Sequence, residues 1–267
     1  MELREQALNC LAMTAPAAKS EAVAALHQAH LNQEIALNTC AHLKPQQPIP
    51  GLPSKPNLVS PKDVKRRAMT TVEGRAAMIH ALAHIEFNAI NLALDAVWRF
   101  TDMPVQYYAD WLKVAAEEAY HFTLLNAHLQ KLGFQYGDFN AHGSLWEMAE
   151  KTTEDVLARM ALVPRTMEAR GLDASPSLRA KLAQAGDMEA AAVLDIILRD
   201  EIGHVLIGNY WFNYLCHQRN LEAISAYANL AVQYEAPTPR KPFNHSARLA
   251  AGFTEAELAW LDNTPAN

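Results

Sequence analysis

The stretch ILRDEIGHVLIGNYWF, residues 197–212, is the clearest indication of the fold and of a site within it. Its apolar residues recur at the three- and four-residue intervals of a helix that buries one face. Glu201 and His204 lie three residues apart on that face, beside Ile197 and Val205. A lone buried carboxylate is costly unless it is paired, neutralised or bound to a cation. We therefore expect Glu201 and His204 to bind a cation together.

A second copy of the same E-x-x-H pattern occurs at Glu118 and His121. Its neighbours at helical spacing are apolar, and so are those around a third candidate, Glu86. Each E-x-x-H pair aligns one oxygen donor and one nitrogen donor in one direction. Two such pairs, with one further glutamate from each of two other helices, would make a six-ligand cage for two metal ions. Glu86 supplies one of these glutamates.

The remaining glutamate is Glu168 or Glu154. The ligands of one metal site must lie at the same depth in the bundle, and this requirement can be checked for each candidate. The midpoint between Glu168 and Glu201 falls near the turn signal AGD at 185–187. The midpoint between Glu154 and Glu201 falls near Pro176, which is also a plausible turn. Glu168 continues an apolar stripe, whereas Glu154 has charged neighbours, so Glu168 is preferred. Pro176 and a glycine before it are expected to break or kink the helix soon after Glu168.

Each E-x-x-H pair is preceded by another acid, Glu117 or Asp200. Metal-bound histidines usually donate their other ring N–H to such a carboxylate. We expect Asp200 to accept a hydrogen bond from His121, and Glu117 to accept one from His204, across the bundle. His84, two residues before a ligand, is a further candidate for this outer layer of the site.

The chain as a whole predicts an all-α protein, because Gly is scarce and the alternation typical of strands is missing. Three capping boxes mark helix starts, namely Thr70 with Glu73, Ser144 with Glu147 and Thr254 with Glu257. The expected helices are 2–13, 18–43, 70–100, 104–132, 144–170, 187–217, a stretch ending near 234, and a short final helix. Four long helices between 70 and 217 form a bundle. Residues 1–69, with a proline-rich connector at 45–61, and residues 218–267 are additions packed on it.

Composition narrows the classes of partner. The net charge is -6, and the longest basic run is Lys65 to Arg67, so nucleic acid and anionic membranes are not expected partners. The chain has no uninterrupted apolar stretch of about 18 residues that would span a bilayer. Its three cysteines are scattered. These observations predict a cytoplasmic protein. The sequence leaves the oligomeric state open, with a homodimer as one candidate.

Residues 70–217 resemble the ferritin-like di-iron carboxylate proteins through their paired E…E-x-x-H arrangement. Within this range, HIEFNAINLALDA, MALVPRTMEARGLD and RDEIGHVLIGNYWF are similar to an uncharacterised bacterial ferritin-like family. The EAR around Glu168 also resembles the tRNA-modifying di-iron monooxygenases, which favours Glu168 over Glu154. The resemblance implies a ferritin-like bundle with a metal site, but it does not imply a substrate.

The leading functional hypothesis is a dioxygen-using oxidoreductase that oxidises a small organic substrate. Two metal ions are expected, iron first, with manganese or a mixed iron–manganese pair as alternatives. The competing class is metal handling, such as a ferroxidase or a storage protein without organic turnover. A third hypothesis, tRNA modification, would need a local basic patch of Lys62, Lys65, Arg66 and Arg67.

Overall fold

A computed structural model describes residues 1–65 and 67–264, and in this part of the chain the regular elements are all helices. The all-α prediction is confirmed. The chain forms two compact units, Met1–Trp146 and Glu147–Asn267. The expected bundle, 70–217, is therefore divided between two units, and each unit holds one long helical hairpin.

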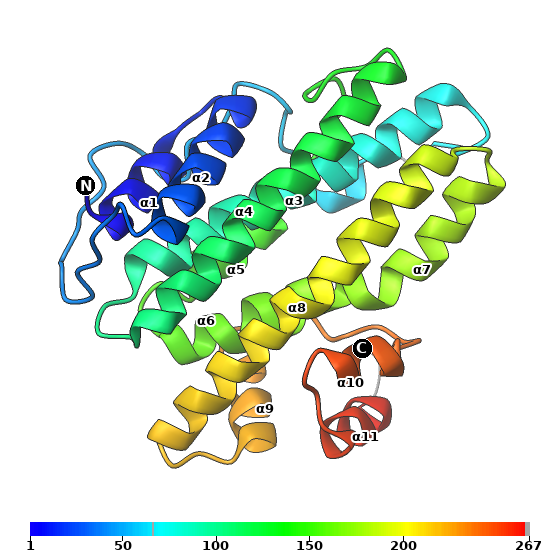
Figure 1. Cartoon of the computed structure of the whole chain (residues 1–267). Helices are drawn as coiled ribbons and strands as arrows, with labels where there is room; N and C mark the ends of the chain where they lie inside the picture. The colour runs from blue at the N-terminus through cyan, green and yellow to red at the C-terminus, as the bar shows by residue number, and fades with distance from the viewer. Residues whose placement is uncertain (66, 265–267) are drawn as a thin grey trace. The chain divides into compact units, whose positions relative to one another are not determined.

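The hairpin of the first unit consists of α3 (Val72–Arg99) and α4 (Val105–Lys131), joined by a short turn (Figure 1). Helices α1 (Leu3–Ala12) and α2 (Pro16–Leu31) pack on it, α1 against α3 and α2 against α4. The expected helix 18–43 is too long by about twelve residues, because the chain leaves α2 at Leu31 and Gln33 has a φ of 60°.

Helix α3 is the core helix of the first unit, and almost every side chain from Ala83 to Trp98 is buried. Its N-cap is Thr71, whose hydroxyl accepts a hydrogen bond from the N–H of Gly74. The capping box expected at Thr70 with Glu73 is thus wrong, because Thr71 is the N-cap and Gly74 has no side chain to complete a box. Among the described residues, α3 alone is long and apolar enough to cross a membrane by length and composition, and 72% of its most apolar window is buried. Core helices meet the same criterion.

A buried lysine holds the N-terminal segment on α3. The Lys19 ammonium group donates to the carbonyls of Leu11 at 3.2 Å and Gly51 at 3.1 Å, and to Asn91 Oδ1 at 2.5 Å. It also lies 4.8 Å from the ring centre of Phe87. The cation therefore links α1, α2, the proline-rich connector and α3. The connector continues through a short 3-10 helix, Pro61–Asp63.

The second unit contains the other hairpin. Helix α5 (Ser144–Lys151) leads into it, followed by α6 (Val156–Leu162), a π-helix (Val163–Glu168), α7 (Ala169–Gln184) and α8 (Met188–Gln218). Helices α9 (Ala223–Gln233), α10 (His245–Ala250) and α11 (Glu255–Asn263) complete the unit. The expected helix 144–170 is wrong in two respects, since a turn interrupts it at 152–155 and the helical path then continues to Gln184.

Helix α7 continues through Pro176, where the sequence predicted a break. A proline has no N–H, so the carbonyl four residues earlier, that of Leu172, loses its helical donor. The Asn244 side chain replaces that donor, with Nδ2 at 3.1 Å from the Leu172 carbonyl oxygen. Asn244 also caps α10 by accepting from the N–H of Ala247. The C-terminal segment thus supplies the hydrogen bond that lets α7 pass the proline.

Helix α8 approaches the π-helix closely at one glycine. A Cβ atom added to Gly208 would lie 2.4 Å from the Cβ of Pro164, far inside van der Waals contact. A Cβ added to Gly203, one and a half turns earlier on α8, would meet nothing within 4 Å. Gly208 is therefore needed for helix packing, which fixes the register between the π-helix and α8.

Candidate metal centre

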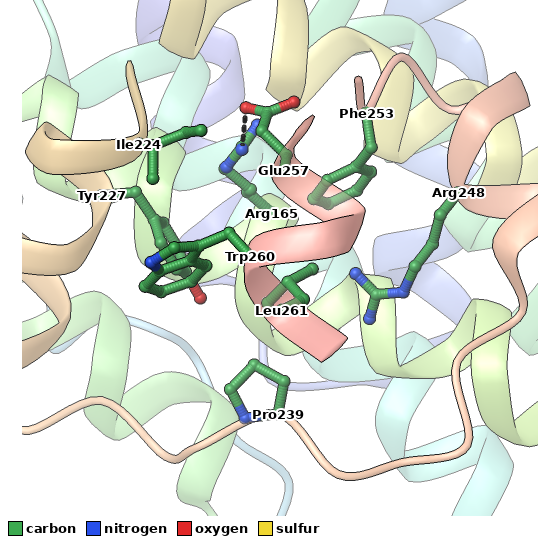
Figure 2. A pocket seen from close by; sticks show the side chains of 9 residues that line it. All are labelled: Arg165, Ile224, Tyr227, Pro239, Arg248, Phe253, Glu257, Trp260 and Leu261. Atoms are coloured by element: carbon green, nitrogen blue, oxygen red, sulfur yellow. Dashed lines mark hydrogen bonds and ion pairs between the residues drawn. The ribbon is translucent and has the colours of Figure 1, made fainter. Parts of the chain in front are cut away.

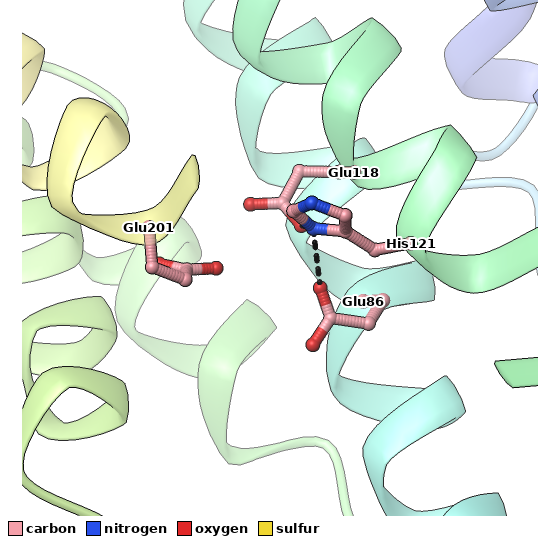
Figure 3. A group of neighbouring side chains, drawn as sticks. All are labelled: Glu86, Glu118, His121 and Glu201. Carbon is pink, nitrogen blue, oxygen red and sulfur yellow. Dashed lines mark hydrogen bonds and ion pairs between the residues drawn. The ribbon is translucent and has the colours of Figure 1, made fainter. Parts of the chain in front are cut away.

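Three of the predicted ligands meet in the first unit. Glu86 lies 13 residues before Arg99 at the end of α3, and Glu118 lies 13 residues after Val105 at the start of α4, so the hairpin brings them to one level. The Nδ1 atom of His121 lies 3.3 Å from Glu86 Oε2 and 3.4 Å from Glu118 Oε2. Figure 3 shows the imidazole beside both carboxylates. All three residues are buried.

The charges of this cluster are strongly coupled. Burial, and then the neighbouring charge of Glu118, raise the pKa of Glu86 well above its usual value. Burial alone would lower the pKa of His121, but its hydrogen bonds to Glu118 and Glu86 and their charges outweigh burial and raise it to about 11. Without a metal, a proton on the imidazole is the cation that stabilises two buried carboxylates. A divalent cation could take the place of that proton.

The second E-x-x-H pair has the same local geometry on α8. Glu201 and His204 are buried, and His204 Nδ1 lies 3.7 Å from Glu201 Oε1. Glu168 is the last residue of the π-helix and is half-buried. Because Pro164 contacts Gly208 and the two helices run antiparallel, Glu168 lies at the level of His204, one turn further along each helix.

Glu154, the alternative to Glu168, lies in the turn between α5 and α6 and is exposed. A carboxylate in an exposed turn is solvated and has no need of a metal. The position of Glu168 on the helix that packs against α8 favours it as the ligand. The turn at 185–187, used to place Glu168 and Glu201 at similar depths, is where α7 ends and α8 begins.

The acids that precede the two motifs have partners on their own helices. Glu117 is half-buried and forms an ion pair with Lys113 at 2.6 Å. Asp200 is also half-buried and pairs with Arg199 at 2.8 Å. Their expected hydrogen bonds to His204 and His121 stay predictions.

His84 contacts the loop that follows α4. Its Nδ1 lies 2.8 Å from the hydroxyl of Tyr136 and its Nε2 lies 3.2 Å from the carbonyl oxygen of His142. The Nε2 atom also lies 3.1 Å from Asn88 Nδ2 on α3, so the ring contacts both α3 and the loop that follows α4. The outer-layer role of His84 stays a prediction. Burial lowers the pKa of His84 to about 4, so the ring is neutral. Tyr136, which the sequence reasoning missed, carries no pattern that would have identified it.

The basic patch expected for tRNA is sparse. Lys62 and Lys65 are exposed, and Arg66 lies outside the described residues. Arg67 forms an ion pair with Glu73 at 2.8 Å and lies over the ring of Phe139. One member of the patch is thus engaged within the first unit.

Comparison with known proteins places the chain in a family. Residues 12–259 match the family described as "Protein of unknown function (DUF455)". An uncharacterized protein of Haemophilus influenzae is 51% identical over 236 residues, covering 86% of this chain and 82% of that protein. No solved structure matches the chain. The chain therefore belongs to the family described as protein of unknown function (DUF455).

Proposed function

We propose that this protein is a ferritin-like di-metal carboxylate protein that uses dioxygen to oxidise a small organic substrate. In this proposal the hairpins of the two units would close as a four-helix bundle, and the ligands of the second unit would join those of the first. The six ligands are Glu86, Glu118, His121, Glu168, Glu201 and His204. The single observation that carries the proposal is the buried Glu86, Glu118 and His121 cluster, together with a second buried E-x-x-H pair on α8.

The chemistry of the donor set fits two divalent metal ions. Four carboxylates bring four negative charges into a buried region, and two divalent cations would balance them. Carboxylate oxygens with imidazole nitrogens suit iron and manganese, whereas a zinc or iron–sulfur site built on cysteine would need thiolates. Cys10, Cys40 and Cys216 are free and none belongs to the cluster. We expect iron first, and manganese or a mixed pair as the alternatives.

When bound, a pair of redox-active ions would supply the electrons that reduce dioxygen. The protein contributes the surroundings. Ala83, Ile90, Ala115 and Phe122 are buried on the faces of α3 and α4 that carry the ligands, so this side of the site is apolar and excludes water. An apolar wall that excludes water suits a small organic substrate better than a strongly hydrated, polar substrate. Free cysteines agree with the cytoplasmic location that we propose.

The proposal is tested by loading the metal-free protein with ferrous iron without oxygen and then adding dioxygen in an oxygen electrode. We expect rapid oxygen consumption in the wild type and a large loss of it in the Glu118→Gln variant, which keeps the side-chain volume. Glu255→Gln, which changes an exposed glutamate on the first turn of α11, is the control and should retain most of the consumption. Equal oxygen consumption in the wild type and Glu118→Gln would refute the proposal.

The size of the assembly separates oxidation from storage. We propose a small assembly, with a homodimer as the expected state, because storage needs a hollow shell of many chains. Light scattering should give one or two chains per particle. A particle of a dozen or more chains, filling with iron after aerobic loading, would instead support the ferroxidase and storage alternative.

A further inference from the structure

The π-helix that ends in Glu168 carries a buried arginine. The guanidinium group of Arg165 lies against three aromatic rings, 4.7 Å from the ring centre of Phe212, 5.4 Å from that of Tyr227 and 4.7 Å from that of Phe253. It donates to Asn209 Oδ1 at 2.6 Å and forms a buried ion pair with Glu257. Figure 2 shows this ion pair between the π-helix and α11.

Glu257 has two functions at the same time. Its Oε2 atom accepts from the N–H of Thr254 at 2.7 Å and from the Thr254 hydroxyl at 2.9 Å, which closes the capping box of α11. Its Oε1 atom accepts from Arg165. The same carboxylate thus caps α11 and contacts Arg165. The structure of the last helix is coupled to the π-helix through one side chain.

Other residues fix the same segment. The hydroxyl groups of Tyr227 and Thr166 lie 3.0 Å apart, and Arg248 pairs with Asp173 at 2.7 Å on the first turns of α7. The amide N–H of Ala169 bonds to the carbonyl of Pro164, five residues back, as in a π-helix. Such segments contain one residue more than a regular helix and are uncommon without support.

The cavity among these side chains is too small for a ligand. Arg165, Arg248, Tyr227, Phe253 and Glu257 enclose a space of about 10 Å³, which is room for one water molecule. Both guanidinium groups are already neutralised by carboxylates. The cluster therefore serves a mechanical role.

We propose that the Arg165–Glu257 ion pair is a positioning device: the C-terminal helix α11 holds the π-helix and so directs Glu168 toward the metal pair. This inference rests on the proposed function. If the segment relaxed to a regular helix, residues beyond it would rotate by the angle of one residue, about 100°. Glu168 lies at the end of the segment, so the direction of its carboxylate would change.

The test compares Glu257→Gln with Glu255→Gln. Glu255 lies on the first turn of the same helix and is exposed, so its variant controls for a change in the charge of α11. Two quantities are measured: hydrogen exchange of the backbone amides of residues 165–172 in the metal-free protein, and the number and affinity of Mn²⁺ ions bound without oxygen. Because a lone buried charge destabilises, the double variant Arg165→Met with Glu257→Gln removes both charges together.

We expect Glu257→Gln and the double variant to exchange these amides at least about tenfold faster and to keep one Mn²⁺ site while the second weakens at least about tenfold. Glu255→Gln should match the wild type in both measurements. Unchanged exchange and unchanged Mn²⁺ binding in the double variant would overturn the inference. If the wild type binds no metal, the proposed function and the positioning of a ligand both fail, and faster exchange would then show only a mechanical contact.

Discussion

Metal binding at the cluster of Glu86, Glu118 and His121 should release at least one proton, so metal affinity should rise steeply with pH. In the metal-free protein the pKa of His121 is raised to about 11, because the hydrogen bonds and charges of two carboxylates outweigh burial. A metal ligand must be a neutral imidazole. At pH 6 to 8 the incoming metal therefore displaces a proton from nearly every molecule. One proton released corresponds to about tenfold in affinity, or ~1.4 kcal/mol, per pH unit.

Between pH 6 and pH 8 the affinity of the wild type for Mn²⁺ should thus increase about 100-fold. The pKa of Glu86 is also raised, so its carboxyl group can hold a second proton that the metal would displace. Release of this proton would make the increase of affinity with pH steeper. Affinity is measured by competition with a chromophoric chelator of known pH dependence. In His121→Gln the remaining sites should bind with a slope smaller by about one proton. An affinity of the wild type that does not change from pH 6 to 8 would refute the account of this cluster.

Stability measurements would not isolate this effect. A histidine whose pKa is raised from 6.5 to about 11 contributes stability that is complete below pH 6.5 and is lost as the pH rises toward 11. Lys19 acts in the opposite direction, because burial lowers its pKa from 10.5 to about 7 and stability then increases between pH 7 and 10.5. Glu86 and Cys10, whose pKa values are also raised, add further slopes. The pH dependence of stability is therefore a sum over several groups, whereas the affinity of the metal reports the cluster alone.

Three further outcomes are expected. Gly208→Ala should lower the free energy of unfolding by ~1–3 kcal/mol through overpacking, whereas Gly203→Ala on the same helix should raise it by up to ~1 kcal/mol. Denaturant titration measures both free energies. Equal effects of the two substitutions would contradict the packing argument. Asn244→Ala should lower the free energy of unfolding by ~2 kcal/mol, because it removes both a helix cap and the donor to the Leu172 carbonyl. In a Pro176→Ala background, where residue 176 regains its amide N–H, the same substitution should lower it by only ~1 kcal/mol. An equal loss in both backgrounds would show that Asn244 does not replace the donor missing at Pro176. Chelation should lower Tm, and Mn²⁺ at 100 times Kd should restore ~2.7 kcal/mol for each occupied site. A Tm that responds to neither treatment would mean that the native state binds no metal.

The ligand-bearing helices were predictable because their apolar faces are long and regular. α3, α4 and α8 begin and end within about two residues of the expected bounds, since turns and caps adjoin strong periodicity. The polar residues on those faces were conspicuous for the same reason. Glu86, Glu118 and His121 needed no long-range information, because a tight turn at equal distance from both glutamates determines their level.

The errors arise where a distant residue decides the local structure. Pro176 predicts a break, and only Asn244, far along the chain, provides the replacement hydrogen bond. The π-helix has no local signal, because its support comes from α8, α9 and α11. Arg165 lies among apolar residues in the sequence, and the capping-box pattern of its partner Glu257 gives no indication of the ion pair. Helical spacing in the sequence does not reveal pairs of side chains that lie far apart along the chain.

The most direct test of the central claim is elemental analysis of protein purified without chelator or affinity metal, repeated on the Glu118→Ala/Glu201→Ala double variant. Circular dichroism of the variant shows whether it remains folded. The account predicts about two iron or manganese ions per chain in the wild type and their loss in a variant that stays helical. No bound metal in the wild type, and no uptake when ferrous iron is added without oxygen, would contradict it and leave the buried carboxylates as a structural network.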